Sequence, residues 1–586
     1  MISNYNKSPG VKINGKDTGC FAGWDNIAIQ LNNEISKNPI TRKIIVVECY
    51  QGIDDDEVLG SLAKGLSPDT TFLASQAMLP EEEIRRITFP DVTNDRIFGY
   101  ITRLNMENFY DPAKLDTLRT KILAIENGTV LIYGTGAVIL FPEPDLLIYA
   151  DMARWEIQHR MRLHEVCNLG ISNCEDTFEG QYKRAYFVDW RVCDRLKKRI
   201  MNRWDYVLDS NLRNKPVMLS ADAFSEGMKQ AVRRPFSVVP FFDAGPWGGQ
   251  WMKEKFDLDK SYENYAWCFN CIPEENSIYL LFGETRFETP AINLTFSKPA
   301  ELLGDPVQAR FGDEFPIRFD FLDTIEGGNL SVQVHPVTEY IQEKFGINYT
   351  QDESYYILEA DTEANVYLGL KEGIDPDNMI KDLRESENNS TEFDDTIYVQ
   401  KWPAKKHDHF LIPGGTIHCS GKGCMVLEIS ATPYIFTFKL WDWGRLGMDG
   451  QPRPINIDHG IQNIIWDRTT LWVNNNLVNQ IEAISKGDGW REEKTGLHKR
   501  EFIETRRHWF TKKVHHCTNE GVNVLALVEG HEIIVESPTG SFEPFVVHYA
   551  ETFIVPAVVG EYTIRPYGES EGQECATIKA YVRVNG

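Results

Sequence analysis

The 586-residue sequence lacks any hydrophobic run near the ~18 consecutive apolar residues that a membrane-spanning helix needs. It also lacks an excess of basic residues, with 61 Lys and Arg against 86 Asp and Glu and a formal net charge of −25. Because phosphates repel an acidic protein, we expect no broad binding to nucleic acid or to anionic membranes. A local basic pocket for a small phosphorylated molecule stays possible.

Cysteine is scarce: 11 cysteines, an odd number, are spread thinly along the chain. Secreted disulfide scaffolds are short and dense in cysteine. The opening segment, Met1–Lys7, has no signal-peptide shape either. We therefore expect a cytoplasmic protein with free thiols. Cys268 and Cys271 form the sole Cys-x-x-Cys pair, and two partly buried thiols are a simpler interpretation than a metal or redox site.

What the sequence does contain is typical of folded domains, since 42% of residues are hydrophobic and 25% are charged. The length favours two to four domains. In the first ~210 residues, the runs Lys43–Tyr50, Val130–Tyr133 and Leu146–Tyr149 predict buried strands. Helical patterns cover about Asp55–Lys64 and Asp151–Cys167. This alternation predicts an α/β domain with a parallel sheet.

The sequence pattern changes from about Arg234, where short runs of alternating apolar and polar residues are separated by Gly, Pro, Asn and Asp. Such spacing predicts a β-sandwich or jelly roll. A helical insertion is expected from Asp375 to about Glu387. The predicted strands include Leu330–His335, Ala364–Leu368, Met425–Ile429 and Asn523–Val528.

Four polar residues of this β region can form a metal site. Gln333 and His335 share one face of a strand, because alternate residues of a strand point the same way. Glu353 opens a later strand, and His418 follows a Pro-Gly-Gly turn. Two imidazoles, a carboxylate and an amide oxygen suit a catalytic divalent metal such as Zn²⁺. From spacing alone, a hydrogen-bonded strand histidine is the commoner explanation.

The sequence segments around these residues resemble those of a known family. Leu330–Pro336 and Ile412–His418 resemble signature segments of the type I mannose-6-phosphate isomerases of the cupin superfamily. Further similar segments follow the family's order: Trp247–Gly249, Val366–Lys371 and Trp441–Arg445. The resemblance covers about residues 234–586 and implies mainly-β cupin domains of the jelly-roll type.

The resemblance implies one Zn²⁺ per chain, held by Gln333, His335, Glu353 and His418, and a catalytic or substrate-positioning role for Arg445. The family are intramolecular oxidoreductases of carbohydrate metabolism that interconvert mannose 6-phosphate and fructose 6-phosphate through an enediol. An ion pair with Asp442 is the structural alternative for Arg445. The expected partner is a small sugar phosphate, with no nucleic acid and no membrane.

Two positions depart from the family pattern. Asp320 and Gln351 stand where the family tends to have lysines. A carboxylate in place of a lysine repels a phosphate or an enediolate. These positions favour an alternative function, a non-catalytic sugar-phosphate-binding or regulatory protein on the same metal-cupin scaffold.

The amino-terminal region weakly resembles P-loop nucleoside and uridine kinases, through Asn108–Pro112 and Asp151–Glu156. A phosphate-binding loop would read Gly-x-x-x-x-Gly-Lys-Ser/Thr after the first strand. Here Glu48–Asp55 contains no lysine, and Asp54–Asp56 starts the helix with three acids. We expect a degenerate kinase-like scaffold that does not use ATP, with no cofactor-binding residues.

The expected organisation has four parts. Residues 1–210 form the kinase-like α/β domain with a degenerate phosphate loop, and 211–233 form a linker. Residues 234–500 form the metal-binding cupin domain with the helical insertion. Residues 501–586 form a small cupin-like β domain.

Overall fold

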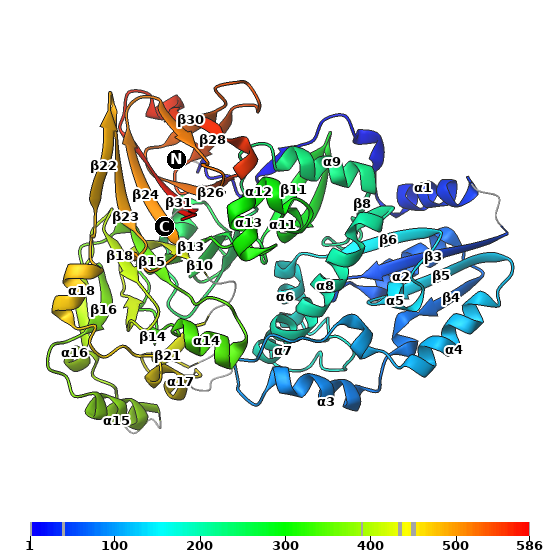
Figure 1. Ribbon diagram of the computed structural model, residues 1–586, viewed down its shortest axis with the longest axis horizontal. Helices are drawn as coiled ribbons and strands as arrows, with labels where there is room; N and C mark the ends of the chain where they lie inside the picture. The colour runs from blue at the N-terminus through cyan, green and yellow to red at the C-terminus, as the bar shows by residue number, and fades with distance from the viewer. Residues whose placement is uncertain (1–2, 38–40, 388–390, 432–435, 447–452, 585–586) are drawn as a thin grey trace. The chain divides into compact units, whose positions relative to one another are not determined.

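The computed structural model describes residues 3–37, 41–387, 391–431, 436–446 and 453–584 (Figure 1). The chain divides into two compact units. The α/β unit comprises Gly10–Ala231 and Ser277–Ser297. The β unit comprises Met1–Pro9, Val232–Asn276 and Lys298–Gly586.

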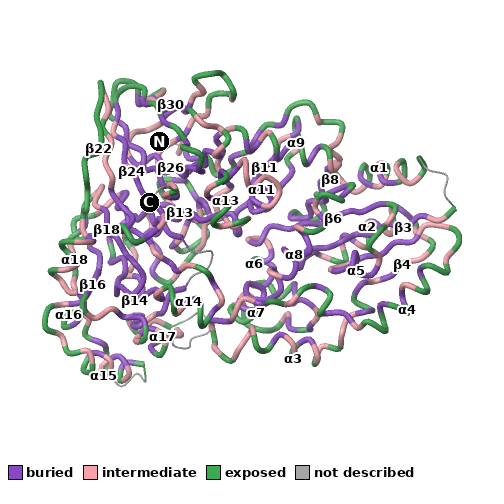
Figure 2. The backbone as a smooth tube through the Cα atoms, in the orientation of Figure 1, coloured by how far each residue is buried: buried purple, intermediate pink, exposed green. Residues whose placement is uncertain are grey.

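The α/β unit is built on a seven-stranded sheet in the order β2-β8-β7-β6-β3-β5-β4. Five neighbouring strands of this sheet pair in parallel, as predicted. They are β3 (Arg42–Cys49), β4 (Thr70–Leu73), β5 (Gly128–Gly134), β6 (Leu146–Asp151) and β7 (Tyr206–Asp209). Runs rich in Ile, Val and Leu form these strands because helices cover both faces of a parallel sheet. Figure 2 shows β3 and β6 mostly in the colour of buried residues.

Helices connect these strands. The predicted helix after β3 is α2, and the one predicted to run to Cys167 ends earlier, at Arg162, as α6. The helices of this unit's first segment are α1 (Trp24–Ser36), α2 (Asp55–Leu66), α3 (Glu81–Val92), α4 (Pro112–Leu123), α5 (Ala137–Leu140), α6 (Arg154–Arg162), α7 (Phe178–Arg184), α8 (Trp190–Ile200) and α9 (Ala221–Ala231).

Residues 211–233 are not the linker that the sequence suggested. They carry β8 (Val217–Ser220), which pairs antiparallel with β7, and helix α9. Strand β2 (Cys20–Ala22) pairs with the other edge of β8. A four-residue strand gives little periodic signal, so the prediction ended the sheet one strand too early.

The chain enters the β unit at Val232 and returns to the α/β unit at Ser277, where it forms a hairpin. Strands β11 (Ser277–Phe282) and β12 (Thr285–Pro290) pair with each other, and β1 (Gly10–Lys12) joins β11 in parallel. Helix α11 (Ile292–Ser297) follows them. The chain therefore returns to its first unit inside the region expected to be entirely β domain.

The β unit begins with two sheets that together hold the predicted metal ligands. The six-stranded sheet has the order β18-β15-β20-β13-β10-β9, and the five-stranded sheet has the order β17-β16-β19-β14-β21. The six strands are β18 (His409–Ile412), β15 (Glu353–Ala360), β20 (Cys424–Ser430), β13 (Arg318–Asp323), β10 (Trp267–Cys271) and β9 (Phe241–Asp243). The five are β17 (Val399–Pro403), β16 (Asn365–Leu370), β19 (His418–Ser420), β14 (Val332–Val334) and β21 (Phe438–Trp441).

The second part of the β unit is a sandwich of a six-stranded and a four-stranded sheet. Buried side chains from both sheets, among them Phe510, Leu527 and Tyr562, form one hydrophobic core. The larger sheet contains β22 (Glu482–Gly487), β23 (Trp490–Gly496), β24 (Ile503–Phe510), β31 (Cys575–Val582), β26 (Asn523–Glu529) and β29 (Thr552–Val555). The smaller contains β25 (Val514–Cys517), β30 (Glu561–Pro566), β27 (Glu532–Glu536) and β28 (Phe545–His548).

Short helices connect the strands of the β unit. The predicted insertion is confirmed as α15 (Pro376–Glu387), and residues 388–390 after it lie outside the described part of the chain. The others are α10 (Trp251–Lys255), α12 (Pro299–Leu303), α13 (Asp305–Phe311), α14 (Thr338–Phe345), α16 (Asp395–Tyr398), α17 (Ile457–Ile461) and α18 (Thr470–Asn476).

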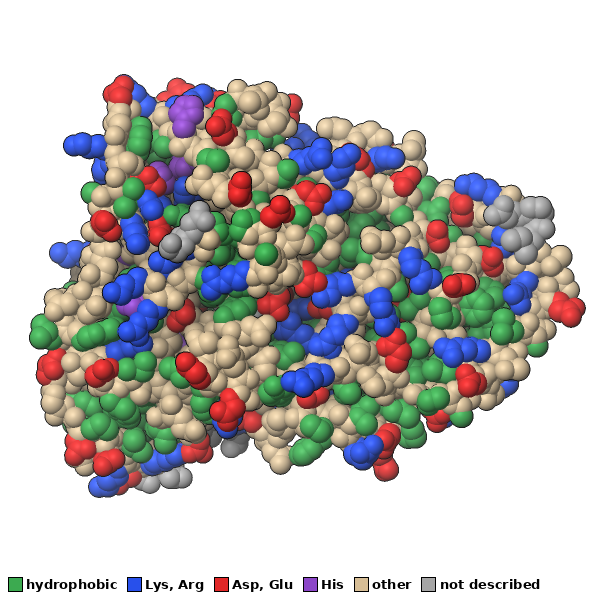
Figure 3. All heavy atoms as spheres, in the orientation of Figure 1, with side chains coloured by type: hydrophobic (Ala, Val, Ile, Leu, Met, Phe, Trp, Pro, Cys, Tyr) green, Lys and Arg blue, Asp and Glu red, His purple; other side chains and the backbone are tan. Residues whose placement is uncertain are grey.

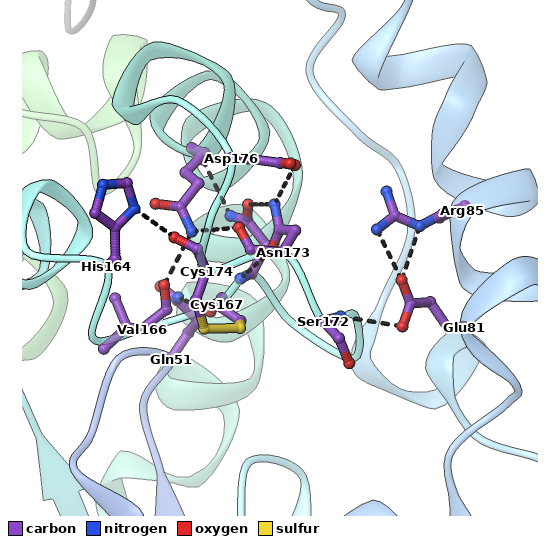
Figure 4. The surroundings of a disulfide bond; sticks show 12 residues. Gln51, Glu81, Arg85, His164, Val166, Cys167, Ser172, Asn173, Cys174 and Asp176 are labelled. Carbon is purple, nitrogen blue, oxygen red and sulfur yellow. Dashed lines mark hydrogen bonds and ion pairs between the residues drawn. A yellow bond between two sulfur atoms is a disulfide. The ribbon is translucent and has the colours of Figure 1, made fainter.

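The expectation of free thiols is wrong for one pair. Cys167 and Cys174 form a disulfide in the loop that follows α6 (Figure 4). The loop turns back on itself and brings the two Cα atoms to 4.4 Å, a separation that a disulfide can span. Cys268 and Cys271 are buried free thiols, in agreement with the simpler interpretation of that pair.

One face of the molecule carries charges of both signs. In Figure 3, acidic and basic side chains are interspersed among uncharged ones on this face. Within the described residues, no helix combines the length and apolar character needed to cross a membrane.

Candidate metal centre

The two facing sheets of the β unit bring the predicted ligands together. Gln333 of β14 lies directly opposite His418 of β19 in the five-stranded sheet. His335 follows β14 by one residue, and Glu353 is the first residue of β15 in the six-stranded sheet. The cluster therefore joins the interior faces of both sheets.

Glycines shape the turn that leads to His418. A Cβ atom on Gly414 would lie 2.5 Å from the carbonyl oxygen of Pro336, and Gly415 has a φ of +86°. Either position is strained for a residue with a side chain. The Pro-Gly-Gly turn thus allows the chain to pass close beside the strand that carries His335.

The three ionisable candidate ligands are in direct contact. Glu353 Oε2 lies 3.0 Å from His335 Nε2, and Glu353 Oε1 lies 3.0 Å from His418 Nε2. Gln333 Nε2 lies 3.2 Å from His418 Nε2. His335, Glu353 and His418 form the sole group of three or more such side chains, within the described residues, whose ligand atoms all lie within 4.8 Å of one another.

Backbone carbonyls orient both imidazoles. His335 Nδ1 lies 2.8 Å from the carbonyl oxygen of Phe436, and His418 Nδ1 lies 2.9 Å from that of Thr416. When the imidazoles are neutral, as metal binding requires, donation from each Nδ1 leaves a lone pair on each Nε2 that faces the cluster. Gln351 Nε2 donates to Glu353 Oε2 over 2.9 Å and fixes the carboxylate in turn.

The electrostatics and the unsatisfied atoms fit a metal ion. Burial disfavours the charged form of Glu353, but the two imidazoles outweigh it and hold its pKa well below the usual value. Burial lowers the pKa of His418. His335 Nε2 and Glu353 Oε1 are fully buried and have no hydrogen bond of good geometry. Buried atoms of this kind need a partner, and the cluster can hold a metal ion.

A second acidic group lines the same interior face. Asp320 of β13 lies directly opposite Glu428 of β20, and Glu428 lies opposite Tyr355 of β15. Since Glu353 and Tyr355 are alternate residues, all three carboxylates point to one side of the sheet. Burial, and then the charge of Glu353, raise the pKa of Asp320 well above its usual value. Burial is also the main cause that raises the pKa of Glu428.

Glu428 was missed by the sequence reasoning. Its signal is a single acid inside the otherwise apolar strand Met425–Ile429, which was interpreted only as a buried strand. An acid on the buried face of a sheet is costly unless it has a function or a partner.

Arg445 is placed differently from the other predicted residues. Its Nη2 lies 3.3 Å from Asp442 Oδ1, and its Nε donates to the Asp442 carbonyl. Asp442 also accepts from Ser331, two residues before Gln333. Among the described residues, no hydrogen bond or ion pair joins Arg445 to the three-residue cluster. The ion pair offered as its structural alternative is present, and Arg445 Nη1 is buried without a hydrogen-bond partner.

Comparison with known proteins gives partial matches. Residues 23–233 match a family described as "Domain of unknown function (DUF8485)". The chain is 27% identical to the mannose-6-phosphate isomerase of Streptococcus mutans over 217 residues, which cover 37% of this chain and 63% of that protein. It is 29% identical to the mannose-6-phosphate isomerase ManA of Bacillus subtilis over 153 residues, which cover 26% of this chain and 45% of that protein. The chain thus spans less than two thirds of the length of these two relatives.

The solved structures that match part of the chain include mannose-6-phosphate isomerases. The B. subtilis enzyme has a TM-score of 0.48 at 18% identity, over 60% of this chain and all of that chain. A zinc-bound mannose 6-phosphate isomerase has a TM-score of 0.46 at 12% identity, with the same coverage.

Proposed function

We propose that the β unit is a metal-dependent aldose–ketose isomerase that interconverts mannose 6-phosphate and fructose 6-phosphate. The buried His335–Glu353–His418 cluster is the observation that supports this proposal most directly. The names of the curated relatives support the choice of substrate, over the part of their length that the chain matches.

We assign Gln333, His335, Glu353 and His418 as the ligands of one Zn²⁺. Imidazole nitrogens and carboxylate or amide oxygens suit this ion, and a catalytic site keeps a position open for water or substrate. The amide of Gln333 turns over to present its oxygen, an exchange that leaves the shape of the side chain unchanged. When bound, Zn²⁺ polarises the sugar oxygens.

The proposed reaction moves a proton between C1 and C2 of the open-chain sugar through an enediol. It needs a general base near these carbons and positive charge near the developing oxyanion. We propose Arg445 as the residue that positions the substrate and stabilises this charge, because a guanidinium stays protonated and donates several hydrogen bonds. The buried, unpartnered Nη1 of Arg445 supports this role.

The test is conversion of mannose 6-phosphate to fructose 6-phosphate by the full chain, before and after treatment with a chelator. We expect chelation to abolish turnover and added Zn²⁺ to restore it. The double variant H335A/H418A should lose both metal and turnover. The exposed His515 provides the matched control, so H515A should keep both. Turnover that survives in H335A/H418A would refute the metal site.

The alternative is a non-catalytic sugar-phosphate-binding or regulatory protein on the same scaffold. Asp320 and Glu428 favour it, because they place two buried carboxyl groups beside the cluster and neither supplies a cation that could attract a phosphate or an enediolate. A protein that contains one Zn²⁺, binds mannose 6-phosphate and shows no turnover would support this alternative.

A further inference from the structure

The α/β unit contains a cavity of about 880 Å³ at the carboxyl edge of its parallel strands. Its walls come from the segments that follow β3, β4, β5 and β6. From β3 the chain continues to β4, at one edge of the sheet. From β6 it continues to β7, in the opposite direction along the strand order. Ligands of open α/β sheets bind in the crevice at such a reversal. The volume is also typical of sites for small molecules.

One wall of the cavity is a loop held in place by covalent and hydrogen bonds. Cys167 belongs to this wall and is joined to Cys174 (Figure 4). Gln51 Nε2, from the turn after β3, donates to the Cys167 carbonyl over 2.8 Å. Ser172 N donates to Glu81 Oε2 at the start of α3. A wall fixed before binding lowers the ordering cost of binding a ligand.

The charges of the lining argue against a phosphorylated ligand. The lining includes two guanidinium groups, and both are engaged by protein carboxylates. Arg160 Nε lies 2.8 Å from Glu156, and Arg213 lies 2.8 Å from Glu165 and 3.3 Å from Asp54. The lining carboxylates are Asp54, Asp55, Asp56, Glu81 and Glu165.

The helix end that faces the cavity is already capped by the protein. Asp54 Oδ1 accepts from Glu57 N over 3.1 Å at the start of α2. A helix N-terminus attracts phosphate through its free N–H groups and its dipole, and here a carboxylate occupies that role. The adjacent helix start therefore offers no anion site.

Two of the carboxylates have no cationic partner. Asp55 accepts a hydrogen bond from Tyr133 OH over 2.8 Å, and no described residue forms an ion pair with Asp55 or Asp56. Apolar side chains complete the lining, including Ile53, Leu79 and Ile171. The lining of the cavity thus combines two exposed carboxylates that have no cationic partner with apolar surface.

We infer that this cavity binds a small organic cation, with a protonated amine against Asp55 and Asp56 and an apolar body against the remaining lining. This site belongs to the α/β unit and is independent of the isomerase proposed for the β unit. Two adjacent carboxylates attract a protonated amine more strongly than one does, since both charges act on it.

Isothermal titration of the full chain tests this inference with three amines: tyramine, putrescine and glucosamine. Two analogues of tyramine are the matched ligands, 4-hydroxyphenylacetate with a carboxylate and 4-ethylphenol without charge. We expect at least one amine to bind saturably, with one site per chain, and the carboxylate analogue not to bind. Hydrogen exchange should slow in residues 50–56 and 165–172 on binding.

The variant D55N/D56N should weaken amine binding at least tenfold, because the amides keep the shape and remove the charge. The control E82Q/E126Q removes two exposed acids of the same unit and should bind as the unchanged chain does. The inference is overturned if none of the amines binds below 10 mM, if D55N/D56N binds equally well, or if 4-hydroxyphenylacetate binds as tightly as tyramine. Unchanged circular dichroism excludes misfolding of the variants.

Discussion

Asp320 and Glu428 lie directly opposite each other on neighbouring antiparallel strands, with both carboxylates on the face that carries Glu353. Two ionised carboxylates in this position would repel each other, and burial raises the pKa of both carboxyl groups well above the usual value. Asp320 is only 6% exposed, and the structure gives its carboxylate no hydrogen bond. The interior beside the candidate metal cluster therefore contains two carboxyl groups, and neither position supplies a cation for a sugar phosphate.

Replacing Asp320 by lysine should improve the use of a phosphorylated sugar. In D320K, a cation would face Glu428 and attract the phosphate or the enediolate. We expect the KM for mannose 6-phosphate to fall at least tenfold, an effect of about 1.4 kcal/mol. The control D377K makes the same charge change at an exposed position of α15 and should leave KM unchanged. If D320K misfolds, D320N should still lower KM; an unchanged KM in a folded D320N would contradict the argument.

Gln351 should tune the metal affinity without binding the metal. It donates to Glu353 Oε2 and so fixes the orientation of that carboxylate. Loss of such outer hydrogen bonds typically weakens metal binding 10–100-fold. We predict that Q351A retains zinc after purification but releases it to a competing chelator at a concentration about tenfold lower. Q342A, at an exposed glutamine of α14, is the matched control. Equal zinc retention in Q351A and Q342A would contradict this role.

The sequence predicted much of this arrangement because the positions of the candidate metal ligands depend on local rules. Alternation along a strand placed Gln333 and His335 together, and the Pro-Gly-Gly turn placed His418 at the start of β19, as observed. Residues whose roles depend on distant pairing were less predictable. Nothing local to Glu428 indicates that Asp320 is its neighbour, since the register of β13 and β20 arises from sequence positions more than 100 residues apart.

The nearby partners of a charged residue are also hard to predict. Arg445 belongs to a segment that resembles a family motif, but it forms an ion pair with Asp442 and donates to the Asn329 carbonyl. The Cys167–Cys174 disulfide depends on the path of a loop that has no periodic signal. Strand β8 was missed for a similar reason, because its four residues form a strand only through their pairing with β7.

A buried carboxyl pair should make the stability of the α/β unit depend on pH. Burial raises the pKa of Glu288 to about 7 and that of Asp209 to about 6. The folded chain therefore holds protons that the unfolded chain has released, and its stability should fall as pH rises from about 4.5 to about 7. E288Q keeps the acceptor for Ser277 and removes the charge. We expect E288Q to be more stable than the unchanged chain by roughly 2 kcal/mol at pH 7.5, and by much less at pH 5.

Urea unfolding at the two pH values measures this difference. E82Q removes an exposed acid of the same unit and should show the pH dependence of the unchanged chain. A loss of stability in E288Q at pH 7.5 would show that the pair contributes favourably in its ionised form.

The α/β unit should not bind ATP tightly. The start of α2 is capped by Asp54, and the turn Tyr50–Asp54 contains no lysine to hold phosphates. Titration of the full chain with ATP and Mg²⁺ should give no Mg²⁺-dependent binding below about 1 mM, a free energy of roughly −4 kcal/mol. Tight, Mg²⁺-dependent binding would refute the expectation that this unit does not use ATP.

Removing the Cys167–Cys174 disulfide should destabilise the α/β unit locally. The bond closes a short loop with a sequence separation of seven. Loop-closure entropy predicts a loss of about 2 kcal/mol in C167S/C174S, since the effect of a disulfide grows with loop length. Hydrogen bonds such as that from Gln51 to the Cys167 carbonyl remain and should keep the fold intact. Urea unfolding of the variant, and of the unchanged chain in reducing agent, should therefore give the same lowered midpoint. The variant C268S/C271S removes two thiols that form no disulfide and controls for the loss of sulfur. A midpoint that reducing agent does not lower would show that the disulfide makes no net contribution to stability.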